Sequence, residues 1–134
     1  MSMAPGQTAE VERLVTADLT ADALGNRGVR VLATPFVIAL MEDAAGSIIE
    51  PHLPAGAASV GTMVEMRHLA ATPVGMTVRA RATLLETEGR RHLFHVEVFD
   101  ERDKIAEGRH ERFTIPNLAS FLERALNKRS RSAS

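Results

Sequence analysis

The segment from Thr34 to Glu50 constrains the fold of this chain more than any other part of the sequence. Thr34-Pro35 is typical of a helix start, because threonine can cap free amide donors and proline is tolerated in the first turn. Pro51 marks the end of this helix. Its apolar residues recur at steps of three and four along one stripe, namely Val37, Leu40, Met41, Ala44 and Ile48. The opposite side is nearly as apolar, which predicts a helix surrounded by protein on most sides.

The rest of the chain favours β-structure, because apolar residues after Ser59 alternate with a period of two. One strand is expected before the helix and four after it, over residues 10–16, 60–69, 76–86, 93–99 and 104–115. A short amphipathic helix should begin after Pro116-Asn117. We therefore predict an α+β protein in which an antiparallel sheet curls around one central helix.

The expected organisation is a single domain over residues 1–134, with flexible ends at about 1–8 and 128–134. A single sheet wrapped around one helix leaves an edge or a face without cover. We therefore expect a homodimer with a continuous sheet, or a dimer of two such dimers.

Composition excludes several classes of protein. The net charge of −1 predicts no nucleic-acid or anionic-membrane partner, and no apolar run is long enough to span a bilayer. The absence of cysteine rules out disulfides and thiolate chemistry and fits a cytoplasmic protein. The start of the sequence lacks the pattern of a signal peptide.

Glu42 is the first residue that the apolar helix does not explain. Helical geometry places it about 100° from the neighbouring Asp43, off the polar strip and between Ile38 and Ile49. Burying a carboxylate there costs free energy unless it is paired. Two interpretations remain open: an acid or base of an active site, or a structural residue that pairs or reaches water.

His68 and Arg112 raise similar alternatives in the strands. His68 shares a strand face with Val64 and Met66, so it is either a satisfied core histidine or a general acid–base group beside a carboxylate such as Glu42. Arg112 shares a face with His110 and, pointing inward, needs either a protein carboxylate or a ligand phosphate.

Gly61 lies inside an expected strand, where glycine costs stability. It marks either close approach of a ligand or a tight crossing of the buried helix. The sequence contains no Gly-x-Ser-x-Gly elbow, no P-loop, no dinucleotide fingerprint and no metal-like histidine spacing. No metal site is therefore expected.

These segments together resemble the fluoroacetyl-CoA thioesterase family. The resemblance runs in order through residues 34–42, 60–62, 68–78, 88–91 and 108–112. It implies a hot-dog fold and hydrolysis of short acyl-CoA thioesters at a dimer interface. By position it implies that Thr34, Glu42 and His68 are the catalytic threonine, glutamate and histidine. Gly61 then matches the active-site glycine and Arg112 an arginine close to the histidine.

The resemblance also sets the expected chemistry. Glu42 would activate water or attack the carbonyl itself, His68 would shuttle the proton, and Thr34 would orient Glu42 or the substrate. The backbone N–H of Gly61 is a candidate oxyanion donor. No cofactor is implied, since coenzyme A enters as part of the substrate.

The sequence departs from the family in one segment. Residues 24–30, which precede Thr34, are short and carry no aromatic residue, whereas the fluoroacetyl-specific enzyme has a longer aromatic lid there. A generic short or medium acyl-CoA is therefore the expected substrate. The alternatives are a hot-dog enoyl-CoA hydratase and a non-catalytic acyl-CoA-binding dimer.

Overall fold

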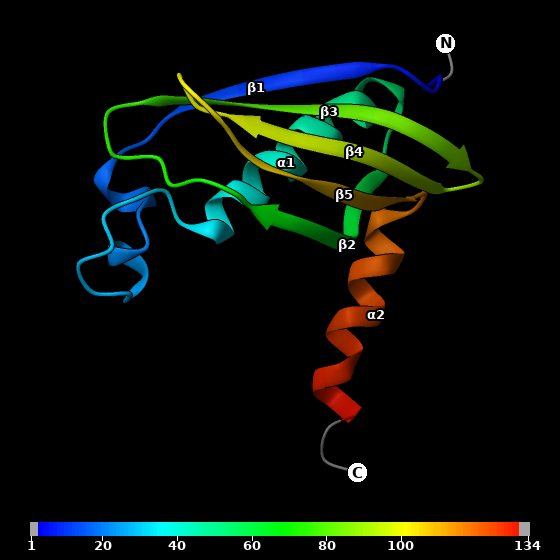
Figure 1. Ribbon diagram of the computed structural model, residues 1–134. Helices are drawn as coiled ribbons and strands as arrows, with labels where there is room; N and C mark the ends of the chain where they lie inside the picture. Colours follow the sequence, from blue (N-terminus) through cyan, green and yellow to red (C-terminus); the bar gives the residue numbers. More distant parts are fainter. Residues whose placement is uncertain (1–2, 132–134) are drawn as a thin grey trace.

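One long helix lies across one face of a five-stranded antiparallel sheet in a computed structural model of the chain, which describes residues 3–131 (Figure 1). The helix is α1 (Thr34–Ile49). The strands are β1 (Thr8–Leu14), β2 (Ala58–His68), β3 (Thr77–Glu88), β4 (Arg91–Phe99) and β5 (Lys104–Ile115). Their order across the sheet is β1-β3-β4-β5-β2. The hot-dog fold expected from the sequence is confirmed.

The core forms where α1 meets the middle of the sheet. All five residues of the predicted stripe on α1 are buried. Val78, Ala80 and Ala82 of β3 are fully buried, while the alternate positions carry the polar side chains that the pattern predicted. Because Ala80 and Ala82 are small, they leave room for the bulkier side chains of α1 to approach the sheet.

The ends of the elements differ from the prediction by small shifts. β1 begins two residues earlier, at Thr8, and the backbone of Gly6 and Gln7 is hydrogen-bonded to Leu84. The predicted short helix is α2 (Leu118–Arg131), so residues 128–131, expected in a flexible end, are helical. Of the two predicted flexible ends, residues 1–2 and 132–134 lie outside the described residues. Three short 3-10 turns complete the chain: η1 (Ala17–Leu19), η2 (Asp22–Leu24) and η3 (Glu50–His52).

β2 lies at one edge of the sheet and β1 at the other. On the side of α1 that carries Glu42, Ala39 is exposed and Ile38 is half-buried, so one chain does not cover the whole helix. Among the described residues, no helix is long and apolar enough to cross a membrane.

Candidate active site

Thr34 and His68 form a direct pair at the beginning of α1. The Thr34 hydroxyl lies 2.8 Å from Nδ1 of His68, the last residue of β2. The N-cap of α1 is Ala33, without a side-chain cap bond, so the predicted capping role of Thr34 is wrong. As the first helical residue, Thr34 instead directs its hydroxyl to His68.

The other ring nitrogen of His68, Nε2, is buried and has no hydrogen-bond partner among the described residues. Burial lowers the pKa of His68 from its ordinary value, an effect that the nearby backbone of Ala70 opposes. The imidazole is therefore neutral at pH 7 and can accept a proton.

A pocket of about 400 Å³ holds this pair. Residues 24–30, here called the lid segment, run beside it and contribute Asn26 and Val29 to its wall. The segment is fixed by its own hydrogen bonds, including Asp22 N–H to Val29 O (2.8 Å) and Gly28 N–H to Oδ1 of Asp22 (2.8 Å). Small or aliphatic side chains form most of the lining, which suits a short acyl group.

Glu42 lies further along α1, directly against Gly61 of β2. A Cβ atom added to Gly61 would stand 2.3 Å from Oε2 of Glu42, so any larger residue would displace the carboxylate. The glycine inside the strand is therefore explained by the close approach of the Glu42 carboxylate. The side chain of Glu42 is 42% exposed, so the expectation of a desolvated carboxylate is wrong within one chain.

Arg112 provides the positive charge beside Glu42, with its NH1 3.6 Å from Oε2 of the carboxylate. The predicted inward arginine thus has a protein carboxylate as its partner. Two further contacts fix its guanidinium: Nε donates to the Ser59 hydroxyl at 3.1 Å, and NH2 donates to the Ser59 carbonyl at 3.0 Å. Burial lowers the pKa of Arg112, an effect that the charge of Glu42 opposes.

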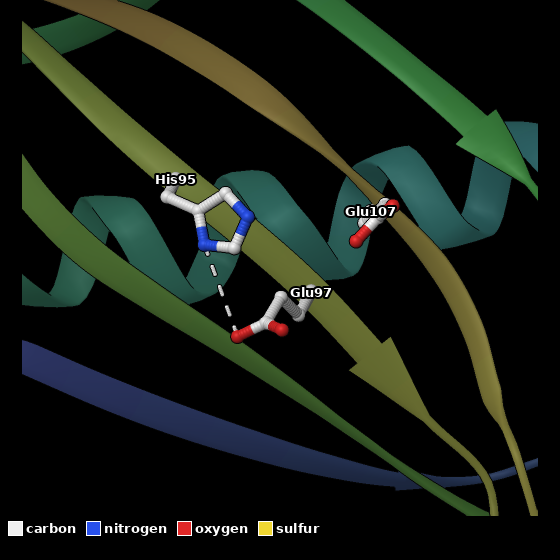
Figure 2. Close-up of side chains that lie close together, drawn as sticks. All are labelled: His95, Glu97 and Glu107. Atoms are coloured by element: carbon white, nitrogen blue, oxygen red, sulfur yellow. Dashed lines mark ion pairs between the residues drawn. The ribbon is translucent and has the colours of Figure 1, made fainter.

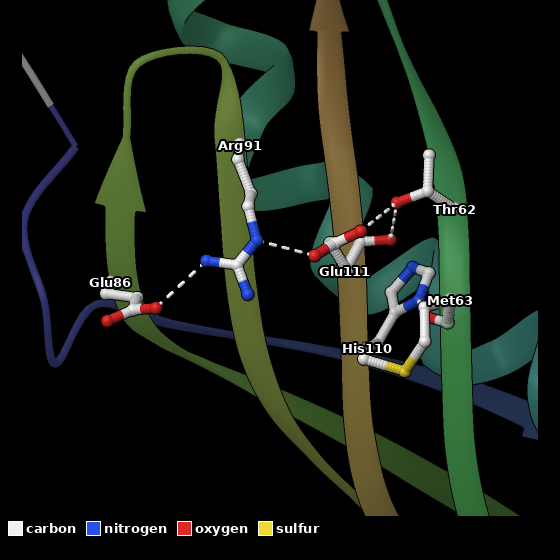
Figure 3. A network of polar contacts seen from close by, with 6 residues as sticks. All are labelled: Thr62, Met63, Glu86, Arg91, His110 and Glu111. Atoms are coloured by element: carbon white, nitrogen blue, oxygen red, sulfur yellow. Dashed lines mark hydrogen bonds and ion pairs between the residues drawn. The ribbon is translucent and has the colours of Figure 1, made fainter.

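His110 completes this group and is a residue whose role the sequence did not indicate. It is fully buried, and its Nδ1 lies 2.9 Å from the Met63 carbonyl, so this nitrogen donates (Figure 3). Its Nε2 then accepts from NH1 of Arg112 at 3.3 Å. Burial lowers the pKa of His110, which keeps the ring neutral beside the arginine. The only sequence signal was its alternation with Arg112.

The two groups lie apart in one chain. Thr34 and Glu42 are eight positions apart in the helix, which is a rise of about 12 Å along its axis. Among residues 3–131, no hydrogen bond or ion pair joins Glu42 to Thr34 or His68. The chain therefore places all five predicted residues along the β2 side of α1, but in two clusters: Thr34 with His68, and Glu42 with Gly61 and Arg112.

The outer face of the sheet carries a separate polar network (Figure 3). Glu111 accepts hydrogen bonds from the Thr62 hydroxyl at 2.7 Å and from Nε of Arg91 at 2.5 Å, and Arg91 also contacts Glu86 at 3.0 Å. These contacts join four strands across the sheet. We therefore give these contacts a structural role, the stabilisation of the sheet.

Three metal-type donors also gather on the sheet, a grouping that the sequence spacing did not predict. Atoms of His95, Glu97 and Glu107 lie within 4.8 Å of one another (Figure 2). However, the ammonium group of Lys104 lies 2.9 Å from Glu97 and is also hydrogen-bonded to Glu107. Because the ammonium group of Lys104 already contacts both carboxylates, we interpret the cluster as an ion-pair network.

The fold makes this chain a hot-dog protein. The polar residues of its candidate site lie between α1 and β2, the edge strand of the sheet. The sequence profile of the family described as fluoroacetyl-CoA-specific thioesterase matches residues 15–118. The chain belongs to this family.

Individual relatives agree with this assignment. The fluoroacetyl-CoA thioesterase of Streptantibioticus cattleyicolor is 44% identical over 85 residues, which span 63% of this chain and 61% of that protein. A solved mutant of the fluoroacetyl-CoA-specific thioesterase FlK, in complex with fluoroacetate and CoA, is 35% identical with a TM-score of 0.85, covering 89% of this chain and 99% of that one. A thioesterase superfamily member from Thermus thermophilus is 36% identical with a TM-score of 0.87 and covers 98% of both chains.

Proposed function

We propose that this protein hydrolyses short or medium acyl-CoA thioesters to the free acid and coenzyme A. The observation that carries the proposal is the Thr34–His68 pair, because a neutral imidazole held through Nδ1 keeps Nε2 ready for proton transfer. Family membership and a relative solved with fluoroacetate and CoA support the same chemistry. The proposed location is the cytoplasm, and no metal or redox cofactor is required.

In the proposed reaction, an oxygen atom attacks the thioester carbonyl, the C–S bond breaks, and a proton reaches the leaving thiolate. Glu42 either removes a proton from the attacking water or attacks the carbonyl itself. In the second case an acyl-glutamyl anhydride forms as the thiolate leaves, and water then hydrolyses it to release the acid and Glu42. His68 transfers the proton, and Thr34 holds its ring. The backbone N–H of Gly61 is the proposed donor to the oxyanion, while Arg112 positions the Glu42 carboxylate.

The separation of the two clusters supports a shared site in a homodimer. Antiparallel pairing of two β2 edges about a twofold axis near Val64 and Glu65 sets the Gly61 end of one strand opposite the His68 end of the other. Glu42 of one copy then approaches Thr34 and His68 of the second. The same pairing covers the apolar side of α1 that a single chain leaves open.

The first prediction concerns this assembly. Light scattering at micromolar concentration should give about twice the 14.5 kDa mass of the chain, or four times that mass for a dimer of dimers. Burial of the β2 edge and of the open side of α1 is the physical reason. A mass near 14.5 kDa would contradict the shared site.

The second prediction concerns the reaction. A series of acyl-CoA thioesters assayed with a thiol reagent should show continuous release of free coenzyme A over many turnovers. Consumption of an enoyl-CoA without thiol release would identify a hydratase. Binding of acyl-CoA without any turnover would identify a sensor instead.

The third prediction concerns specificity. Because the lid segment carries no aromatic side chain, kcat/KM for fluoroacetyl-CoA should be similar to that for acetyl- and propionyl-CoA. A small substituent in an apolar pocket rarely changes binding by more than ~3 kcal/mol. A preference above ~10³ for the fluorinated substrate would contradict this prediction.

A further inference from the structure

Helix α2 leaves the sheet at the edge formed by β2 (Figure 1). Ile115, the last residue of β5, pairs with Ala58, the first residue of β2, so α2 begins beside the start of the edge strand. Leu118 N–H donates to the Gly56 carbonyl at 2.9 Å and fixes the base of the helix. From there α2 projects past β2, away from the sheet and α1 of its own chain.

The apolar face of α2 is largely uncovered within one chain. Leu118, Phe121, Leu122 and Leu126 recur at helical spacing, and the last two are 48% and 55% exposed. A 14-residue helix in water gains little stability by itself and depends on burial of its apolar face. The face therefore requires a partner surface.

A second uncovered apolar patch lies at the opposite end of β2. Leu24 and Val29 of the lid segment, with Leu69 after His68, are 54%, 38% and 52% exposed. Val29 and Leu69 line the pocket that holds Thr34 and His68. The described residues have eight exposed large apolar side chains, and five of them lie in this patch or on α2.

The twofold pairing of β2 edges proposed above would bring these two patches together. In an antiparallel pair, the start of one β2 lies beside the end of the other. Since α2 adjoins the start and the lid segment adjoins the end, the α2 helix of one copy reaches the lid patch of the second. Within residues 3–131 of one chain the two patches cannot meet in this way, because they lie at opposite ends of the strand.

We propose that α2 of each subunit covers the acyl pocket of its partner. Leu122 and Leu126 pack against Leu24, Val29 and Leu69 of the partner subunit and form the outer wall of the pocket. This inference rests on the proposed dimeric thioesterase and adds a third element to its shared site. In this arrangement α2 supplies an apolar cover for the acyl pocket, which the lid segment does not cover alone.

Cross-linking tests the contact directly, because the chain has no native cysteine that would interfere. The full-length double variants Leu24→Cys/Leu126→Cys and Val29→Cys/Leu126→Cys should form covalent dimers with a short bismaleimide. Leu85→Cys/Leu126→Cys is the matched control, since Leu85 is 41% exposed on β3 and should not cross-link. An active dimer that cross-links no better than the control would overturn the proposed contact while leaving the proposed function intact.

Substitution of the apolar face gives an independent readout. Leu122→Ser/Leu126→Ser should lower kcat/KM for acyl-CoA by about tenfold, because it opens the pocket to water, whereas Leu85→Ser should change it little. A weaker dimer in the first variant would also support the contact. Unchanged kcat/KM together with unchanged dimer dissociation would overturn the proposed contact. If the unmodified protein showed no thioesterase activity, that result would contradict the proposed function instead.

Discussion

Glu42→Gln and His68→Ala are each expected to lower kcat by at least ~10², with a smaller change in KM. Glutamine keeps the shape of Glu42 but removes the charge that acts on water or on the carbonyl. Alanine removes the ring that transfers the proton. Both lost interactions act mainly in the transition state, so kcat should carry most of the effect.

Stability measurements on the same preparations separate catalysis from folding. Glu42 contacts Arg112 at 3.6 Å and is 42% exposed, but the side chain of Arg112 is only 12% exposed. Glu42→Gln therefore leaves a largely buried guanidinium without its carboxylate and should lower the melting temperature, an effect that is measured separately from kcat. The kcat of the double variant should be only slightly lower than that of the less active single variant, because the effects of residues that act as a unit are not additive. Full turnover by a well-folded Glu42→Gln protein would exclude Glu42 from the chemistry.

Mixing the two inactive variants should restore activity, to about a quarter of that of the unmodified protein. In a shared site, Glu42 of one chain works with Thr34 and His68 of the other. A mixed dimer of Glu42→Gln and His68→Ala chains therefore has one site with both changes and one with neither. Random assembly makes about half of the dimers mixed, and each of these holds one intact site of two.

The experiment requires subunit exchange, by co-expression or by unfolding and refolding the mixed variants together. Two preparations of Glu42→Gln treated in the same way serve as the control and should remain inactive. If each site lies within one chain, every site of the mixed dimer carries one substitution. Activity would then stay at the level of the single variants, and the twofold arrangement of β2 would be wrong.

The main elements of the fold could be predicted because their patterns are local. The apolar stripe of Val37, Met41 and Ala44 depends only on helical periodicity, and the alternation in β3 depends only on the pleat. The anomalies at Glu42 and His68 were equally visible, since each breaks a periodic apolar pattern. Their joint role came from the family resemblance rather than from periodicity.

Other features depend on side chains that meet across long stretches of sequence. Thr34 was predicted as a helix cap, yet its hydroxyl pairs with a histidine 34 residues away. The sequence also could not show that His110 accepts a hydrogen bond from Arg112, or that Lys104 lies between Glu97 and Glu107. Such contacts depend on strand register and on the path of α1, which pattern alone does not fix.

By itself, the sequence determined the element types, the buried face of α1 and the residues that break its pattern, because these follow from the spacing of apolar side chains. Only the tertiary structure decided how those residues are grouped. It paired His68 with Thr34 rather than with Glu42, and it left β2 as an open edge. The reason is physical: distances between segments follow from sheet order and helix packing, and periodicity carries no information about either.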